Sequence, residues 1–592
     1  MNTYLYTKWG RDLSAEHVLE EYPRPKLCRK EYVILNGLWQ YAFTGSRHFP
    51  EKYDGEILVP FSPEASLSRV GRQLQPDEYL HYYRELVIPG TIGKRRWILH
   101  FGAVDQSCCV YINEQKAGRH SGGYLPFSID ITPFVKTGAN TLRVVVKDLS
   151  DSSYHSKGKQ SLERGGMWYT AQSGIWQTVW MEPVPEQYLS DLLIEPDYDG
   201  SKIVIAANSN HPEERFPVHA EISYQGKVLK EADFFSGEAA EVALEHFESW
   251  TPETPHLYDI RLSMCEDAVS SYFAMRKIGV GKDIRGIPRF FLNNKPYFHC
   301  GVLDQGYYPD GLYTAPSDEA LQHDIRAMKD LGFNMLRKHM KIEPARWYYH
   351  CDRIGMLVWQ DMVCGGDNYL SWFIFLPNAF PWIGRSVRDR HDFLFSRRER
   401  RGKIEYIREM KETVRLLRHY PCVAAWVPFN EGWGQFQASA VSRMIRDMDP
   451  SRIIDEASGW FDQGGGDVHS IHQYWGHFFI RKRRRVVAIT ECGGFSYRIP
   501  GHCLCDEVYG YRKYKSGRKL TKGISDFWTW ELIPNVKRGL SAVIYTQVSD
   551  VEDEVNGFLT YDRECMKVDR AVIRRKNREL LGAFLEAVGR RK

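Results

Sequence analysis

The stretch Ala424–Gly432, AAWVPFNEG, contains the pattern on which the interpretation of the whole chain is based. Its leading apolar residues indicate a buried parallel strand, and Glu431 follows at the point where such a strand ends. Val486–Gly494, VVAITECGG, repeats the pattern further along with Glu491. Two glutamates at the same place on two buried strands predict a pair of carboxylates at one end of a parallel barrel. Such a pair is what glycoside hydrolysis requires.

Length and composition indicate a multidomain globular protein. The chain has 592 residues, which is too long for one hydrophobic core and predicts two to four domains. The formal net charge is only +4, from 79 basic and 75 acidic residues mixed along the sequence. No overall field therefore favours nucleic acid or a membrane surface as a partner.

The N-terminal residues and the cysteines bear on the cellular compartment. MNTYLYTKWGRD lacks the basic and then apolar design of a secretory signal, and no apolar run approaches the length of a membrane span. The 12 cysteines lie mostly alone in apolar runs, and Cys503-Leu504-Cys505 lacks a second pair at zinc-site spacing. We expect a cytoplasmic protein without a disulfide framework, a metal or another cofactor.

The first half of the chain has the pattern of strands. Residues 1–185 contain β-branched and aromatic runs separated by turn residues, such as Arg96–Phe101 and Thr141–Lys147, which predicts a jelly-roll β-sandwich. A structural sandwich is the default, and a lectin-like sheet that presents aromatic side chains to sugars is the alternative. Residues 186–276 have the strand number and spacing of an immunoglobulin-like sandwich.

From residue 277 to 592 the pattern alternates between strands and helices, which predicts a (β/α)8 TIM barrel. The expected strands are Phe298–Leu303, Asn334–Arg337, Met356–Gln360, Val423–Val427, Arg452–Asp455, Ser470–Gln473, Val486–Thr490 and Ala542–Thr546. The expected helices include one capped by Ser317, followed by Glu343–Asp352, Ile404–Arg418, Gln435–Met448 and Arg570–Val588. The long connections 362–402 and 492–525 are expected to lie on the active face of the barrel.

Several polar residues at strand ends complete the predicted site. Glu431 ends the fourth strand and Glu491 the seventh, so their side chains can converge across the barrel. Asn430 is suited to a sugar hydroxyl, Tyr474 can keep Glu491 anionic, and Arg337 and His339 add donors. Each alone has an ordinary structural explanation, such as a helix cap, a core tyrosine or a strand-end ion pair. Their joint placement at strand ends favours a catalytic site.

The sequence also resembles glycoside hydrolase family 2, the β-galactosidase, β-glucuronidase and β-mannosidase family, over essentially its whole length. The resemblance rests on Arg418–Glu431 (RHYPCVAAWVPFNE), Asn334–Trp359, Asn36–Trp39 (NGLW), Leu99–Tyr111 and Gly122–Ile131. It implies that Glu431 is the acid/base, that Glu491 is the nucleophile and that Tyr474 contacts the nucleophile. Asp304, Trp433 and His472 complete the predicted substrate-binding residues, with Asn430, Arg337 and His339.

Departures from the family pattern bear on the sugar rather than on bond cleavage. Leu303-Asp304-Gln305 replaces the family's Asn-Arg/Lys-His after the first strand, and Arg337–Met340 is one residue shorter than the usual signature. Glu554–Gly557 lacks the lysine of the Asn-x-Lys pair that β-glucuronidases carry. We therefore expect a retaining exo-β-glycosidase, with a β-galactoside as the leading substrate and a β-glucuronide or another β-glycoside as the alternative. An inactive carbohydrate-binding protein and a sandwich-rich adhesion or scaffold protein are the alternatives from other classes. A homo-oligomer is compatible with the sequence.

Overall fold

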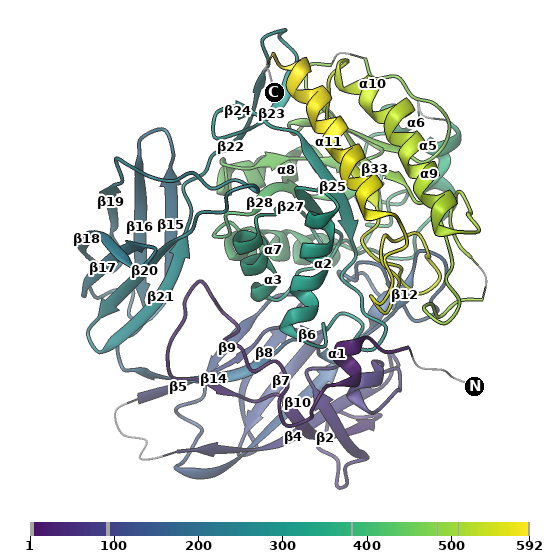
Figure 1. Cartoon of the computed structure of the whole chain (residues 1–592). Helices are drawn as coiled ribbons and strands as arrows, with labels where there is room; N and C mark the ends of the chain where they lie inside the picture. The colour runs from purple at the N-terminus through teal and green to yellow at the C-terminus, as the bar shows by residue number, and fades with distance from the viewer. Residues whose placement is uncertain (1–4, 90–94, 381–382, 482, 507, 590–592) are drawn as a thin grey trace.

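The computed structural model describes residues 5–89, 95–380, 383–481, 483–506 and 508–589. Its fold is that of two β-sandwiches followed by a TIM barrel, as the sequence predicts (Figure 1). The division of the chain at residues 185 and 276 stays a prediction. In the described parts of the chain, no helix is both long enough and apolar enough to cross a membrane.

The N-terminal sandwich packs a six-stranded sheet against a four-stranded one. The larger sheet has the order β3 (Gly55–Val59), β2 (Gly37–Thr44), β4 (Tyr79–Ile88), β10 (Gly138–Lys147), β7 (Ser107–Ile112) and β8 (Gln115–Ser121). The smaller has the order β1 (Val33–Ile34), β14 (Val179–Pro185), β5 (Arg95–Phe101) and β9 (Phe127–Asp130). Inward residues of both sheets, including Trp39 and Leu99, form one apolar core. Alternating apolar residues therefore build this domain, as they do in other sandwiches.

The second sandwich is smaller. One sheet has the order β15 (Leu189–Asp197), β16 (Lys202–Ser209) and β19 (Ala239–Ala243). The other has the order β18 (Lys227–Phe235), β17 (Pro217–Tyr224), β20 (Tyr258–Met264) and β21 (Asp267–Phe273). A hairpin sheet of β22 (Ile278–Lys282), β23 (Pro288–Leu292) and β24 (Lys295–Pro296) leads into the barrel.

The barrel strands form one parallel sheet of eight. Its order is β30 (Ile453–Ile454), β28 (Val423–Val427), β27 (Leu357–Asp361), β26 (Met335–Lys338), β25 (His299–Asp304), β34 (Leu540–Thr546), β33 (Val486–Gly493) and β32 (Val468–Gln473). The sequential order of the strands around the sheet is that of a (β/α)8 barrel. Every residue of β27, β28, β33 and β34 is buried, which explains why these segments are continuous apolar runs.

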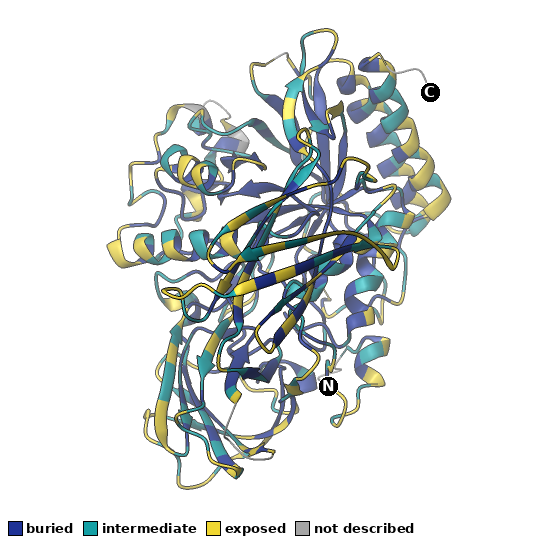
Figure 2. Cartoon of the chain, turned by 90° about the vertical axis from the view of Figure 1, so that its left-hand side faces the viewer, coloured by how far each residue is buried: buried dark blue, intermediate teal, exposed yellow. Residues whose placement is uncertain are grey.

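Helices surround these strands. They are α2 (Asp318–Asp330), α3 (Ala345–Ile354), α7 (Arg400–Leu417), α8 (Ala438–Met448), α9 (Gly517–Phe527), α10 (Ile533–Val536) and α11 (Arg570–Ala587). Ser317 caps α2 as predicted, because its hydroxyl accepts a hydrogen bond from the Ala320 N–H at 3.2 Å. The helix that leads to the C-terminus alternates between buried and exposed faces in Figure 2, so only one stripe of it packs on the barrel.

The two long connections contain more structure than the sequence indicates. Residues 362–402 include the short helices α4 (Ser371–Ile374), α5 (Leu376–Ala379) and α6 (Ile383–Ser386). Phe373, Phe395, Phe461 and Trp433 form an apolar cluster with this segment. In the second connection, α9 begins at Gly517, so the expected loop 492–525 is shorter than predicted. Its capping residue is Ser516, whose hydroxyl accepts from the Lys519 N–H.

Arg29 links the segment before β1 to both sandwiches. Its guanidinium is 6% exposed and donates to Asp267, Glu182 and the Leu189 carbonyl at distances of 2.6–3.1 Å. We expect Arg29→Met to lower the free energy of unfolding by about 3–5 kcal/mol, because two carboxylates lose their buried partner. The measurement is urea-induced unfolding followed by tryptophan fluorescence. Arg95→Met is the control, since its ion pair with Glu31 is exposed and should contribute at most about 1 kcal/mol. Equal losses in the two variants would contradict this account.

Candidate active site

Glu431 lies at the carboxyl end of the fourth barrel strand. After β28, Pro428 leads into β29 (Phe429–Asn430), which pairs with β31 (Ala457–Ser458). Glu431 then adopts a φ of 51°, and its N–H donates to the Ser458 carbonyl at 2.9 Å. A left-handed backbone at a residue other than glycine costs about 1–3 kcal/mol and is most frequent at functional sites. The left-handed turn therefore fixes the position of the Glu431 carboxylate, and it lowers the stability of the folded chain in doing so.

Glu491 lies within the seventh strand, β33. The Tyr474 hydroxyl donates to its Oε2 at 2.5 Å, and Arg337 donates to its Oε1 at 3.2 Å. Tyr474 follows β32 directly and Arg337 belongs to β26, so the strand-end positions predicted from the sequence bring these residues together. Glu491 is thus a carboxylate held by two donors, one of them charged.

His472 lies between the two glutamates. Its Nδ1 is 2.7 Å from Glu431 Oε1, and its Nε2 is 3.6 Å from Glu491 Oε1. One carboxylate oxygen of each glutamate lies within 4.8 Å of the other. Trp433 donates from its indole N–H to the second oxygen of Glu431 at 3.2 Å. The convergence of Glu431 and Glu491 is therefore a feature of the structure.

The electrostatic environment favours the ionised form of Glu491. Burial raises the pKa of its carboxyl, but the positive charges of His472 and Arg337 outweigh burial and lower the pKa to about 2. Burial raises the pKa of the Tyr474 hydroxyl well above its ordinary value, so Tyr474 remains a donor to the carboxylate. Glu491 is consequently anionic throughout the neutral range.

Arg337 connects more residues of the site than the sequence predicts, since the sequence indicates only an additional hydrogen-bond donor near the glutamates. Its guanidinium is fully buried and forms a double hydrogen bond to Asp361, with both distances 2.9 Å. It also donates to the Asn430 side-chain carbonyl at 2.9 Å. Asp361 was missed in the sequence, although it ends the third strand in the run Leu357–Asp361 and so obeys the rule that identified the glutamates.

Two predicted substrate-binding residues do not contact the glutamates directly. His339 Nδ1 lies 2.6 Å from Asp361 Oδ2, so it joins the site through Asp361. Asp304 accepts from the Lys338 ammonium at 2.7 Å, and Lys338 also binds Glu343. Among the residues that the structure describes, Asp304 has no hydrogen bond to either glutamate, which makes it part of a neighbouring ion cluster.

Two clusters of described residues have the side-chain types of a metal site: Glu431, His472 and Glu491, and separately His502, Asp562 and Glu564. In the first, ligands bound to one zinc ion at about 2.0–2.1 Å would lie about 3.3 Å apart. The 2.7 Å contact between His472 and Glu431 is shorter than this and is instead a hydrogen-bond distance. In the second, Glu564 is exposed and paired with Arg11. Neither cluster requires a metal to explain its contacts.

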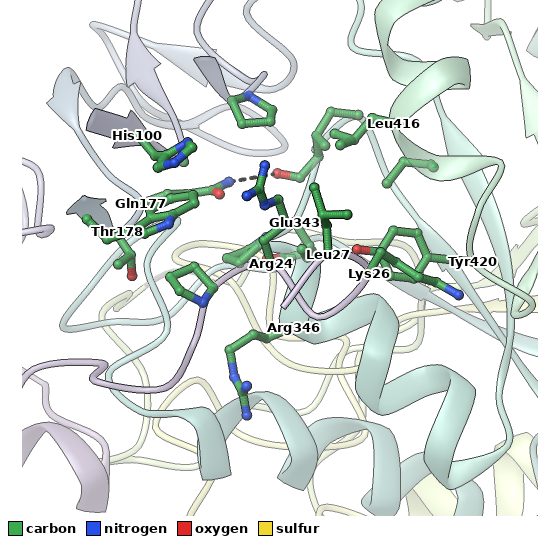
Figure 3. Close-up of a pocket in the computed structure, with 18 of the residues that line it drawn as sticks. Arg24, Lys26, Leu27, His100, Gln177, Thr178, Glu343, Arg346, Leu416 and Tyr420 are labelled. Carbon is green, nitrogen blue, oxygen red and sulfur yellow. Dashed lines mark hydrogen bonds between the residues drawn. The ribbon is translucent and has the colours of Figure 1, made fainter. Parts of the chain in front are cut away.

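A cavity of about 610 Å³ lies away from the glutamates, between the N-terminal segment, the first sandwich and α3 and α7 of the barrel (Figure 3). Its charged groups are largely paired with other side chains, as in Arg24 with Glu182 and Arg346 with Asp318. Gln177 crosses it with a hydrogen bond to the Ile342 carbonyl at 3.3 Å. None of the residues that line this cavity hydrogen-bonds to Glu431 or Glu491, so it plays no part in their chemistry.

The lowered pKa of Glu491 predicts a pH dependence of stability. The folded carboxyl has a pKa of about 2, below its ordinary value of 4.5, so the unfolded chain binds the proton more readily between these values. The ionised group therefore contributes stability above about pH 4.5, of order 3 kcal/mol, and loses it as the pH falls towards 2. We expect the difference in unfolding free energy between wild type and Glu491→Gln to decline below about pH 4.5 in urea titrations. A difference that is constant between pH 7 and pH 3 would contradict this assignment.

Comparisons with known proteins identify the domains. The family description "Glycosyl hydrolases family 2, sugar binding domain" matches residues 72–185, and "Glycosyl hydrolases family 2, TIM barrel domain" matches residues 287–471. The β-galactosidase of Leuconostoc mesenteroides is 24% identical over 489 residues, which cover 73% of this chain and 43% of that protein. The β-galactosidase of Lactococcus lactis is 25% identical over 338 residues, which cover 56% of this chain and 32% of that protein.

The chain thus spans less than half of the length of these curated relatives. Among solved structures, a β-glucuronidase from an uncultured Clostridium species has a TM-score of 0.70 at 18% identity, with 93% of this chain and 99% of that chain covered. At this identity the likeness concerns the fold alone. The matched sugar-binding and TIM barrel domains show that the chain belongs to glycoside hydrolase family 2.

Proposed function

We propose that the protein is a retaining exo-β-glycosidase that removes terminal β-linked sugars, with a β-galactoside as the leading substrate. The observation that carries the proposal is the approach of the Glu431 and Glu491 carboxylate oxygens to within 4.8 Å, with His472 between them. In retaining glycosidases the two carboxyl groups lie about 5–5.5 Å apart, against about 6.5–9.5 Å in inverting ones. The short separation supports double displacement.

In this mechanism Glu491 attacks the anomeric carbon and forms a covalent glycosyl-enzyme. Its ionisation suits this part, because Tyr474 and Arg337 stabilise the carboxylate. The Tyr474 and Arg337 hydrogen bonds also hold its orientation towards the sugar. As Glu491 loses negative charge on bonding to the sugar, these donors keep its carboxyl group in place for the second displacement, in which water attacks the anomeric carbon and Glu491 leaves as a carboxylate.

Glu431 is the proposed acid and base. It protonates the glycosidic oxygen in the first step and removes a proton from water in the second. The contacts of Glu431 with His472 and the Trp433 indole hold its carboxyl facing Glu491. Asn430, held by Arg337, and His339, held by Asp361, supply polar atoms for the sugar hydroxyls.

The β-galactoside preference rests on two observations of different kinds. The two curated relatives reported above are named β-galactosidases, whereas a third, from Formosa agariphila, is named "Putative beta-glucuronidase". In addition, Glu554–Gly557 lacks the lysine of the Asn-x-Lys pair that β-glucuronidases carry. A β-glucuronide or another β-glycoside is the alternative within the same mechanism. An inactive carbohydrate-binding protein is less well supported, because both glutamates and their hydrogen-bonding partners are present.

Azide rescue tests the nucleophile. We expect Glu491→Ala to lose hydrolysis of an aryl β-galactoside and to regain turnover with added azide, because the small anion occupies the space of the missing carboxylate. The product should be the α-glycosyl azide, identified by its anomeric proton coupling. Glu431→Ala is the matched control and should give the β-glycosyl azide from an activated aryl glycoside. Full activity of Glu491→Ala would refute the assignment.

The stereochemistry of the wild-type reaction is an independent test. We expect the β-anomer of the free sugar to form first, followed by mutarotation, when an aryl β-glycoside is hydrolysed in an NMR tube. Double displacement inverts the anomeric carbon twice, which gives net retention. Initial formation of the α-anomer would exclude the retaining mechanism while leaving a glycosidase activity in place.

A further inference from the structure

A segment of the N-terminal sandwich reaches the carboxyl end of the barrel. Ser156 forms a β-bridge with Gly365, and the N–H groups of Lys157 and Gly158 both donate to the Cys364 carbonyl, at 2.8 and 2.9 Å. Gly158 has a φ of 59°, and a Cβ atom there would lie 2.8 Å from the Met340 carbonyl oxygen. The segment is thus fixed tightly against the residue that follows His339.

The next residue, Lys159, is a cation that packs on an aromatic ring. Its ammonium lies 5.7 Å from the centre of the Tyr169 ring, and the Tyr169 N–H donates to the Lys159 carbonyl at 2.9 Å. Lys159 is half-buried, and its ammonium has no hydrogen bond or ion pair within the part of the chain that the structure describes. An ammonium in this setting has donors available for a ligand.

Glu554 is the acidic group of the same region. It is 6% exposed, and its Oε2 accepts from the Tyr169 hydroxyl while its Oε1 accepts from Asn556 at 3.5 Å. Tyr169 thus contacts both charged residues, because its ring lies beside the Lys159 ammonium and its hydroxyl binds the Glu554 carboxylate. The two opposite charges are nevertheless not in a direct ion pair.

A chain of contacts connects Glu554 to the nucleophile. Asn556 accepts from the Gln547 side-chain amide at 2.8 Å, and Gln547 follows Thr546 at the end of β34. Thr546 Oγ1 lies 3.3 Å from the Tyr474 hydroxyl, which donates to Glu491. Lys159 and Glu554 therefore lie on the rim of the barrel that also carries Glu491.

The electrostatic coupling among these groups agrees with this placement. Burial raises the pKa of the Glu554 carboxyl, the Lys159 charge lowers it, and the Glu491 charge raises it. The Lys159 charge also contributes to the lowered pKa of Glu491. Two further buried polar atoms of the region, the Tyr307 hydroxyl and Gln547 Oε1, have no hydrogen-bond partner among the described residues, and the Tyr307 ring lies 4.9 Å from that of Tyr169. Buried polar atoms without partners are costly, and a ligand hydroxyl can satisfy them.

We propose that Lys159 and Glu554 together bind the hydroxyl groups of an uncharged sugar and discriminate against sugars that carry a carboxylate. A hydroxyl can accept a hydrogen bond from the ammonium and donate one to the carboxylate, so it fits between the two charges. The inference rests on the proposed glycosidase function and specifies its substrate class. It makes a residue of the N-terminal sandwich a determinant of specificity at the barrel.

A substrate carboxylate in the same position would meet two anions, Glu554 and Glu491, and one cation, Lys159. A further negative charge beside two anions is disfavoured, because like charges repel more strongly in a buried site than in water. Arg337 cannot compensate, because its guanidinium is already bound to Asp361, Glu491 and Asn430. The charge balance of the site therefore favours the neutral sugar.

The test compares kcat/KM for 4-nitrophenyl β-D-galactopyranoside and 4-nitrophenyl β-D-galacturonide, which differ only at the sixth carbon. We expect the wild-type protein to prefer the neutral substrate. Lys159→Met and Glu554→Gln should each lower kcat/KM for the galactoside by about 10- to 100-fold, the loss of a hydrogen bond to a charged group. Glu554→Gln should also reduce the ratio of kcat/KM for the galactoside to kcat/KM for the galacturonide, because it removes one of the two anions that repel the substrate carboxylate.

Arg164→Met is the matched control, since Arg164 belongs to the same segment but pairs with Glu552 and Asp553 at a side-chain exposure of 42%. It should leave the ratio between the two substrates unchanged, and Lys159→Arg should retain part of the galactoside activity. Thermal unfolding of each variant identifies any that fail to fold.

A wild-type preference for the galacturonide, or a folded Glu554→Gln variant that keeps the wild-type ratio of kcat/KM between the two substrates, would overturn the inference. The proposed function is judged separately. It would fail if no aryl β-glycoside is hydrolysed and azide does not restore activity to Glu491→Ala, whatever the sugar preference.

Discussion

The buried guanidinium of Arg337 is the interaction on which the candidate site depends. Arg337 lies on β26, and it binds Asp361 of β27, Asn430 after β28 and Glu491 of β33. A planar guanidinium has five N–H donors in fixed directions, so it can hold three acceptors at defined angles. One side chain thereby sets the relative positions of four barrel strands at their carboxyl ends. An uncompensated charge at full burial would be prohibitive, and the two carboxylates make this arrangement possible.

The same cation links the stability of the barrel to the ionisation of the proposed nucleophile. Asp361 binds the guanidinium at two points, whereas Glu491 receives one hydrogen bond from it and another from Tyr474. Asp361 therefore fixes the arginine, and the arginine orients Glu491. Because Asp361 holds Arg337 in place, Glu491 can change its bonding during a reaction without displacing Arg337. Arg337 therefore belongs to the site, although its guanidinium binds Glu491 and not Glu431.

The sequence predicts much of this arrangement because strand ends in a parallel barrel share one face. Glu431, Glu491, Tyr474 and Arg337 each lie at or near the carboxyl end of a barrel strand, and that position brings them to the same face. Asp361 obeys the same rule and could have been found by applying it to every strand. Asp304 obeys it too but turns towards Lys338, and a strand-end position does not reveal which neighbour a side chain will choose. The observed helix ends differ from the predicted ones by a few residues. Helix α8 begins at Ala438 rather than Gln435, because the Asp389 carboxylate, which is distant in sequence, accepts a hydrogen bond from the Ala438 N–H.

Lys159 marks the limit of that reasoning. It directly precedes the two-residue strand β11 (Gln160–Ser161), in an irregular segment of the N-terminal sandwich rather than in the barrel, and no periodicity connects it with Glu491. Its position depends on backbone contacts such as Gly158 with Cys364, which only the folded chain creates. Residues that contact a substrate's distant hydroxyls can come from any neighbouring domain, whereas the reacting carboxylates must lie on the rigid strands. The reacting carboxylates of such a barrel can therefore be predicted from the residues at its strand ends. The specificity for a sugar depends on contacts between domains, which local sequence patterns do not encode.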